Sequence, residues 1–271
     1  MQLTKGAIGN LINRYKAVLK KCHLLNVFGS LAVAGMLVMG GAAAAGAAAA
    51  PDVALGAGGS YDKTDKVNHL MGGGLYKGNK LTANTAVDSD ITLSVEDGSI
   101  SEIIGGSYIS GTNADYKNAT HGTITTTISG GTTSAEFVVG GSKLANNDGA
   151  TLETGTTAVT INGGTFGTEG KINAYELVMG GNYVKTGTAA DGTATTQGSS
   201  VTVNDGKFHA SVVGGSVAHR YNGTGVSTVT DNGNTSVIIT GGTFNPSETD
   251  LSDANGGINL KAAVIGGGLA Y

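Results

Sequence analysis

A two-part pattern of apolar and polar positions recurs from about residue 70 to the last residue of the chain. The first part alternates β-branched and hydroxyl residues and ends in a glycine turn, as in Val159-Thr160-Ile161 followed by Asn162-Gly163-Gly164. The second part is an apolar pair that leads into two glycines. The six apolar-glycine segments begin at Leu70, Ile103, Val138, Val178, Val212 and Val264. Because the two parts always follow in the same order, they predict a chain built from repeats.

The spacing of the glycine turns supports this interpretation. The turn glycines Gly98, Gly131, Gly164, Gly206 and Gly242 lie 33, 33, 42 and 36 residues apart. Self-similarity at such a period is typical of stacked structural units. The alternating runs predict half-buried strands, and Gly-Gly, Asp-Gly and Asn-Gly predict sharp corners in which the glycines take positive φ. We therefore expect each unit to contain a strand, a corner, a second strand, a second corner and a polar segment of variable length.

These features predict an all-β protein. One unit buries too few side chains to form a core, so the units must stack with equivalent Val, Ile and Leu side chains on one another. We expect a right-handed parallel β-helix, or β-solenoid, of about six repeats of about 35 residues over residues 69–271, with 51–68 as a linker or N-terminal edge. Thr/Ser segments such as 122–127 and 225–230 are candidates for a third strand. Two thinner coils per unit, a β-roll and a β-prism are the alternatives.

The first 50 residues differ from the rest of the chain. Residues 1–23 are basic and residues 24–50 are uncharged, ending in a run of alanines before Pro51. A basic region, an apolar region and small residues at the end are the parts of a secretory signal, so we expect a signal helix that is cleaved. A retained membrane helix is the alternative, since the apolar stretch is long enough to span a bilayer. Cys22 precedes the apolar region, which argues against a lipoprotein signal.

Removal of residues 1–50 changes the charge of the protein. All 20 acidic residues but only 11 of the 16 Lys and Arg lie beyond residue 50, so the net charge changes from −4 to about −9. A negative surface opposes nucleic-acid binding, which depends on clustered cations. The one cysteine, Cys22, leaves with the signal. Disulfide and thiol chemistry are then excluded from the mature chain.

The N-terminal segment and the repeats together resemble a known family of proteins. The long basic region from Lys5 to Lys21, the apolar core from Leu24 to Gly41 and the repeats of the form V-T-I-x-G-G-T-F…V-V-G-G-S are similar to autotransporter passengers of Gram-negative bacteria, in particular adhesin-like passengers with extended signal peptides. The resemblance implies export through the inner membrane, a β-helical passenger at the cell surface and a C-terminal barrel in the outer membrane. The residues up to Tyr271 contain no such barrel. A truncated chain, a separately encoded barrel and a secreted protein are the three explanations.

Candidate chemistry is sparse. Parallel β-helices also include lyase-like and glycosidase-like enzymes, which need facing carboxylates, but the acidic groups Glu96-Asp97 and Asp88-Ser89-Asp90 have no counterpart one repeat on. Asp97 and Asp205 are explained as caps of the glycine turns. His209 and His219 flank one corner and are a weak candidate for a metal pair. The sequence therefore predicts no catalytic, cofactor-binding or metal site.

The tyrosines near the double glycines are more regular. Tyr76, Tyr108, Tyr183 and Tyr271 follow a double glycine by a few residues. Equivalent positions in a stack predict a ladder of rings down one face, either as packing that stabilises the coil or as a strip that binds sugar or protein. The variable loops at fixed corners are the other place where binding is expected.

These observations predict an exported protein at the cell surface, in the outer membrane or outside the cell, with an adhesin-like structural or binding role and no catalysis. The expected partners are glycans or proteins of host or bacterial surfaces and an outer-membrane β-barrel translocator. A carbohydrate-active β-helix enzyme is the alternative from a different class, and an inert surface stalk is the third.

Overall fold

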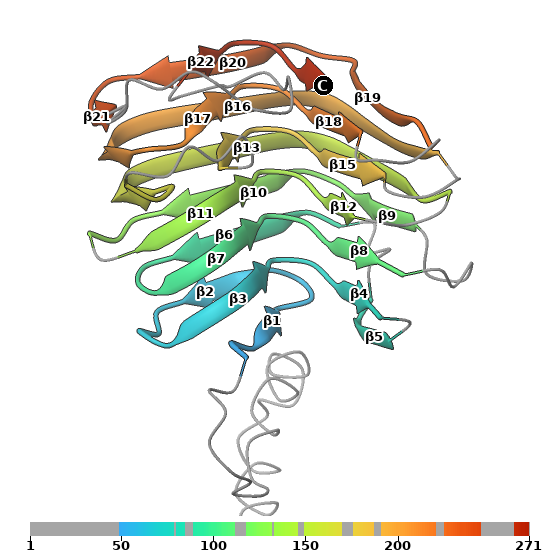
Figure 1. The fold of residues 1–271 in the computed structure, drawn as a ribbon, viewed down its shortest axis with the longest axis horizontal. Helices are drawn as coiled ribbons and strands as arrows, with labels where there is room; N and C mark the ends of the chain where they lie inside the picture. Colours follow the sequence, from blue (N-terminus) through green and yellow to red (C-terminus); the bar gives the residue numbers. More distant parts are fainter. Residues whose placement is uncertain are drawn as a thin grey trace, which may run out of the picture. The chain divides into compact units, whose positions relative to one another are not determined.

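The computed structural model describes residues 49–78, 80–84, 89–111, 118–131, 133–145, 149–169, 176–186, 191–220, 225–244 and 263–270. The described part is all-β and contains no helix. The predicted signal helix over residues 1–50 lies outside it except for Ala49 and Ala50. Residues 51–68, interpreted from the sequence as a linker or edge, include two short strands at the lower end of the stack in Figure 1, β1 (Asp52–Ala54) and β2 (Gly59–Tyr61).

The strands stack in four columns, each formed by the same position of successive repeats (Figure 1). Column I contains β2, β6 (Ile91–Val95), β10 (Ile124–Ile128) and β20 (Thr235–Ile239), together with the middle of β13 (Thr151–Phe166) and of β16 (Gly192–Phe208). Column II contains β1, β3 (Lys66–Met71), β7 (Ser99–Ile104), β11 (Ser134–Val139), β14 (Leu177–Met179), β17 (Ser211–Val213) and β22 (Val264–Ile265).

Column III follows the double glycines. It contains β4 (Leu75–Lys77), β8 (Tyr108–Ser110), β12 (Lys143–Ala145), β15 (Tyr183–Thr186), β18 (Val217–Arg220) and β23 (Leu269–Ala270). Column IV contains β9 (Asn118–His121), the first residues of β13 and β16, and β19 (Ser227–Asp231). The remaining strands are β5 (Lys80–Ala83), which pairs with β4, and β21 (Thr243–Phe244), which pairs with the end of β16.

Nearly all of these pairings are parallel. The sole antiparallel pair among the described strands is β4 with β5. Columns I, II and IV belong to one sheet of 16 strands, and column III with β5 forms a second sheet of 7. A parallel stack whose strands pair with their counterparts one repeat away is compatible with a β-helix.

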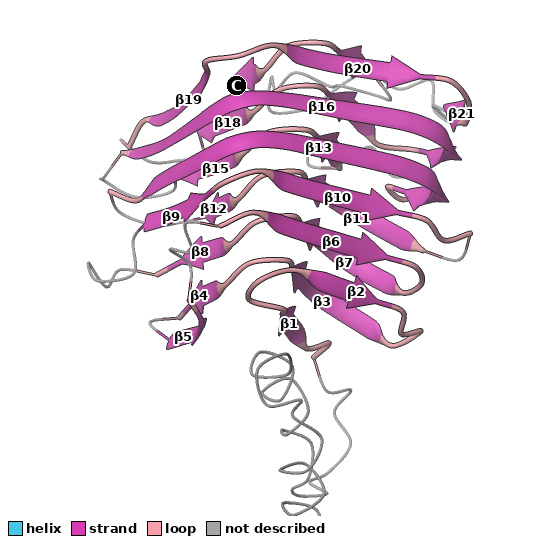
Figure 2. Cartoon of the chain, turned by 180° about the vertical axis from the view of Figure 1, so that it is seen from behind, coloured by secondary structure: helices cyan, strands magenta, loops and turns pink. Residues whose placement is uncertain are grey.

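The polar excursion of each inner repeat contains two strands, one of column III and one of column IV, that the sequence pattern did not separate. Residues 182–199, interpreted as one long polar excursion, supply β15 and the first part of β16. On the side seen in Figure 2, β13 and β16 run without interruption from column IV into column I. The two Thr/Ser candidates for a third strand fall in different columns, because 122–127 overlaps β10 and 225–230 overlaps β19. The two segments therefore do not form one common third strand. Beyond columns I and II, the inner repeats have strands of two further columns, III and IV.

Three clusters of buried side chains hold the stack together. The first lies between columns I and II and includes Leu93, Val138 and Val203. It ends in a stack of phenylalanines, Phe166 on Phe208 at 5.0 Å and Phe208 on Phe244 at 4.8 Å between ring centroids. The second lies between columns III and IV and includes Tyr76, Leu144 and Leu152. The third, between columns II and III, includes Met71, Ile104 and Tyr183.

The turn glycines and the double glycines have different structural roles. Four of the five turn glycines, Gly98, Gly164, Gly206 and Gly242, have positive φ, as predicted for the corners, whereas Gly131 does not. The double glycines do not, which corrects the expectation from sequence. At the first glycine of a pair, such as Gly140, an added Cβ would lie less than 3.0 Å from the carbonyl oxygen of the equivalent glycine, Gly180. Glycine is required there because the backbones of neighbouring repeats approach closely at the bend.

A ladder of buried polar side chains follows the double glycines from repeat to repeat. Each backbone N–H donates to the side chain one repeat on: Gly74 to Ser107 at 2.8 Å, Ser107 to Ser142 at 3.1 Å, Ser142 to Asn182 at 2.7 Å and Asn182 to Ser216 at 3.1 Å. The ladder ends at Asp231, which accepts from Ser216 N–H and Oγ. These bonds satisfy backbone groups that the bend between columns II and III removes from the strand ladders.

Candidate functional site: a groove along the bend

The bend at the double glycines turns the outer faces of columns II and III toward each other. Leu70 and Met71 are adjacent, and their side chains point to opposite sides of β3, into the first and the third cluster respectively. Both are fully buried. Column II therefore has apolar cover on both faces, and the third cluster fills the angle between columns II and III.

An open groove of about 380 Å³ lies over this angle. Its lining is polar and aromatic and comes from successive repeats of columns II and III. The lining residues are Asn68, His69, Ser101, Glu102, Tyr108, Glu136, Phe137, Lys143, Ala145, Glu176, Tyr183 and Lys185. The strand register brings these residues together. In column II, Glu102 pairs with His69 on one side and with Phe137 on the other. In column III, Lys143 pairs with Tyr108 on one side and with Tyr183 on the other.

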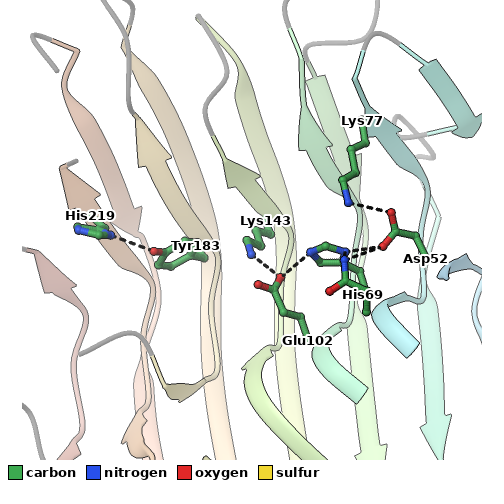
Figure 3. A network of polar contacts seen from close by, with 8 residues as sticks. Asp52, His69, Lys77, Glu102, Lys143, Tyr183 and His219 are labelled. Carbon is green, nitrogen blue, oxygen red and sulfur yellow. Dashed lines mark hydrogen bonds and ion pairs between the residues drawn. The ribbon is translucent and has the colours of Figure 1, made fainter. Parts of the chain in front are cut away.

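A chain of polar contacts begins among the lining residues of the groove and continues beyond them to Asp52 and Lys77 (Figure 3). Asp52 of β1 contacts His69 Nδ1 at 2.6 Å and Lys77 Nζ at 2.9 Å. On its other side, His69 Nε2 lies 3.4 Å from Glu102 Oε2, and this oxygen also accepts a hydrogen bond from Lys143 Nζ. Burial alone would raise the pKa of Asp52, but the hydrogen bonds from His69 and Lys77 outweigh it and lower the pKa.

The ammonium of Lys143 is surrounded by aromatic rings. Its Nζ lies 5.1 Å from the ring centroid of Tyr108, 5.2 Å from that of Phe137 and 5.7 Å from that of Tyr183, within the range of cation–π attraction. The Lys143 side chain is only 9% exposed. Burial lowers the pKa of Lys143, and Glu102 opposes this shift. Burial, together with the charge of Glu102, raises the pKa of Tyr108 to about 12.

A second polar contact lies further along the same columns. Tyr183 Oη lies 3.1 Å from Nδ1 of His219, which is 4% exposed. Burial lowers the pKa of His219 to about 4, and the nearby charge of Lys185 adds to this effect. His219 pairs with Lys185 in the register of column III, which explains their proximity. His219 is therefore neutral at physiological pH.

The predicted tyrosine ladder forms in part. Tyr108 and Tyr183 lie in the same row of column III with Lys143 between them. Tyr76 is the third residue after its double glycine, whereas Tyr108 and Tyr183 are the second. Because side chains alternate along a strand, Tyr76 points to the opposite face and belongs to the cluster between columns III and IV. Tyr271 lies outside the described residues. Tyr108 and Tyr183 are 6% and 3% exposed, so their rings pack around Lys143 and offer little surface to a sugar.

The acidic candidates from the sequence lie elsewhere, and of the two histidine candidates His219 contacts Tyr183 of the groove, whereas His209 is not among the lining residues. Asp97 and Asp205 accept hydrogen bonds at 2.7 Å from the N–H groups of Gly98 and Gly206, which confirms their role in the turns. Asp90 accepts a bond from Thr123 N–H, and Asp88 lies outside the described residues. In the described part of the chain, no group of three or more His, Cys, Asp or Glu side chains is arranged to hold a metal ion.

The sequence interpretation missed Glu102 and Lys143. A signal for Lys143 was available, since it occupies the second position after a double glycine, as Tyr108 and Tyr183 do. Glu102 lies two residues before the end of its apolar run, at the position that His69 holds one repeat earlier. Their contact depends on the bend, which brings columns II and III together. No sequence pattern predicted that angle.

The fold and the groove together define a parallel all-β stack with a polar groove along its bend. Comparison of the chain with protein-family models, with curated proteins and with solved structures found no match. A search of the described residues for membrane spans found no helix with the length and hydropathy required.

Proposed function

We propose that the chain is the passenger portion of an exported, autotransporter-like surface protein with an adhesin-like binding role and no catalysis. In this proposal the parallel stack is a right-handed β-helix of about six repeats, and residues 1–50 direct export. The partners are glycans or proteins of host or bacterial surfaces, and a β-barrel translocator holds the passenger at the outer membrane of a Gram-negative bacterium.

The observation that carries the proposal is the groove along the bend. Parallel strands position its lining residues on a rigid scaffold, and its polar side chains come from several repeats. Glu136 is exposed within it, whereas Lys143 and Glu102 bind each other at its floor. A pre-formed concave surface with charged groups at its rim favours recognition of another molecule.

Export and binding are tested separately. The full chain is expressed in a Gram-negative host, and the N-terminus of the exported protein is sequenced. We expect a new N-terminus near residue 50 and cleavage of the chain by protease added to intact cells. An intact N-terminus and a chain confined to the cytoplasm would contradict the export proposal.

Binding is measured on a glycan array and on purified surface glycoproteins. We expect Glu136→Lys in the groove to weaken binding at least tenfold, because it reverses an exposed charge of the lining. Glu153→Lys is the matched control, since Glu153 is an exposed glutamate in the column IV part of β13, away from the groove. Equal effects of the two variants would contradict the groove as the binding surface, and binding to neither probe set would favour the stalk.

One observation favours the carbohydrate-active enzyme as a second candidate. Glu136 and Glu176 both line the groove, and each lies two residues before a member of the register pair Val138 and Val178. Neighbouring strands are about 4.8 Å apart, which allows two carboxyl groups on them to approach the separation of about 5 Å found in retaining glycosidases. Glu176 Oε2, however, accepts a hydrogen bond from Thr168 N–H. Release of reducing ends from a polysaccharide panel, abolished by Glu136→Gln, would favour the enzyme.

A further inference from the structure

Two reactive groups meet at one carboxyl group at the floor of the groove. Glu102 Oε2 accepts a hydrogen bond from Lys143 Nζ, which is an amine nucleophile when it is neutral. The same oxygen lies 3.4 Å from His69 Nε2, which can carry a proton. The Asp52 contact with His69 Nδ1 at 2.6 Å directs the opposite ring nitrogen toward Glu102.

The surroundings of this pair differ from those of an ordinary ion pair. The side chains of His69 and Lys143 are 10% and 9% exposed, and three aromatic rings lie around Lys143 Nζ. In contrast, Lys207 and Glu169 are paired at 3.3 Å with side chains 43% and 66% exposed. A buried ion pair loses hydration of both charges, whereas the exposed pair keeps it.

We propose that Lys143 and Glu102 form an intramolecular isopeptide bond. The Nζ lone pair of Lys143 attacks Cδ of Glu102, the Cδ–Oε2 bond breaks, and the oxygen leaves as water. The new Nζ–Cδ amide replaces one amine and one carboxylic acid. The reaction needs no oxidant, reductant or further substrate.

Each neighbour of the pair has a role in this step. His69 donates a proton to the departing Oε2 and accepts one from the attacking nitrogen, and Asp52 is a positioning residue that holds the His69 ring. Burial lowers the pKa of Lys143, which increases the fraction of neutral amine. Holding the two groups in contact replaces a bimolecular encounter, for which effective molarities reach about 10⁵–10⁸ M. The neutral amide also removes two charges from a buried place.

The bond would connect two strands that belong to different sheets and do not pair with each other through their backbones. Glu102 lies on β7 of column II and Lys143 on β12 of column III, one repeat later. The cross-link would therefore span the bend and tie one repeat to the next. Cys22 is the only cysteine of the chain, so disulfides are not available for this purpose. The inference does not depend on the proposed export or binding.

The intact mass of the purified, folded full chain tests the proposal. We expect the chain to be lighter than its sequence by one water molecule, and a tryptic digest to contain a branched peptide that joins Lys143 to Glu102. Cleavage after Lys207 should remain complete, because the exposed Lys207–Glu169 pair serves as the internal control. A full sequence mass with complete cleavage after Lys143 would overturn the proposal.

Variants assign the bond to these residues. Lys143→Arg keeps the positive charge but removes the amine, and Glu102→Ala removes the carboxyl group, so both should have the full sequence mass. Loss of water in either variant would overturn the assignment. Circular dichroism establishes that each variant retains its β-structure, and a variant that fails to fold is replaced by Lys143→Met, which fills the same cage with an apolar side chain.

The rate of bond formation tests the histidine and the aspartate. Chain isolated in denaturant is refolded, and its mass is followed with time. We expect His69→Gln to slow the loss of water by about 10²–10⁴-fold. Asp52→Asn should change the pH profile of this rate, which a purely structural role of Asp52 would leave unaltered. Wild-type rates in both variants would overturn the assigned proton transfer.

Discussion

The surroundings of a single side chain in this protein depend on the equivalent residues in the neighbouring repeats. Lys143, Tyr108 and Tyr183 occupy equivalent places in column III, yet one is a cation and two are rings. Their alternation places an ammonium among aromatic faces, which attract it electrostatically. His219 occupies the outer row next to Tyr183 and contacts its hydroxyl group. The environment of each residue is thus set by its neighbours one repeat away.

The low pKa of His219 predicts a pH-dependent stability. Its pKa is about 4 in the folded chain and 6.5 ordinarily. Between these values the unfolded chain binds a proton that the folded chain does not, so this contribution to stability is complete above pH 6.5 and is lost as the pH falls toward 4. We expect the melting temperature to fall by a few degrees over this range. His219→Gln should reduce that dependence, and an unchanged slope in the variant would contradict the role of His219. The lowered pKa of Asp52 acts separately, at lower pH.

At the scale of the element, the bend between columns II and III is the decisive feature. Two glycines allow the backbones of neighbouring repeats to approach, and the side chain of the next residue accepts a hydrogen bond from the equivalent backbone N–H of the repeat before it. Without the bend, the faces of columns II and III that form the third cluster would both be open to solvent. The ladder and the glycines therefore stabilise the groove as well as the fold.

The double glycine is tested with a pair of alanine variants. In Gly140→Ala the new Cβ would clash with Gly180 O and lie 2.7 Å from Val159 Cγ2. We expect a loss of about 2–4 kcal/mol in the free energy of unfolding, since both neighbours belong to the packed interior. Gly131→Ala is the control, because nothing lies within 4 Å of its added Cβ. Urea denaturation measures both variants, and equal losses would contradict the close-approach explanation.

The polar ladder is tested at Asn182. Its side chain accepts from Ser142 N–H and donates to Thr154 Oγ1, Thr196 Oγ1 and Thr195 O. Asn182→Ala leaves several buried groups without partners, so we expect a loss of about 3 kcal/mol or more. Asn182→Ser should lose less, because serine holds the equivalent positions at Ser142 and Ser216 and still offers an acceptor. Urea midpoints that are the same for both variants would refute the ladder as a stabilising feature.

At the scale of the molecule, each repeat packs on its neighbours and the stack behaves as a one-dimensional array. The last described repeat leaves large apolar side chains exposed, including Ile239 at 41% and Val264 at 49%. The equivalent residues of the preceding repeat, Val203 and Val212, are fully buried because the repeat that follows covers them. Burial is therefore a property of the stack and not of the single repeat.

Repeat architecture predicts that one whole unit can be removed. Deleting residues 108–142 joins Ser107 to Lys143, which holds the place of Tyr108 in column III. We expect the shortened chain to remain folded, with a β-type circular dichroism spectrum and a cooperative melt. Deleting residues 124–142 removes only part of a repeat and joins columns that do not match, so this control should unfold. A folded control, or an unfolded whole-repeat deletion, would contradict the repeat boundaries.

Much of the fold follows from local patterns in the sequence. The alternation in Ile91–Val95 and the apolar pairs such as Ile103-Ile104 predicted strands of columns I and II, which the structure contains. The strands of columns III and IV were not predicted, because the side chains on their exposed faces include Thr, Lys and Asn, which are also common in loops. The candidate site was not predicted, since His69, Glu102 and Lys143 are isolated in the sequence and become neighbours only through parallel pairing and the bend.

The sequence by itself determined the repeat, the all-β class and the turn glycines, because strand alternation and positive φ are local properties of a few residues. The export signal, the surface role and the absence of catalysis are still predictions from it. Only the tertiary structure decided the four columns, the need for two glycines at the bend and the contacts of Lys143. These depend on the distance between neighbouring repeats and the angle between columns, and both are set by packing across residues far apart in the chain.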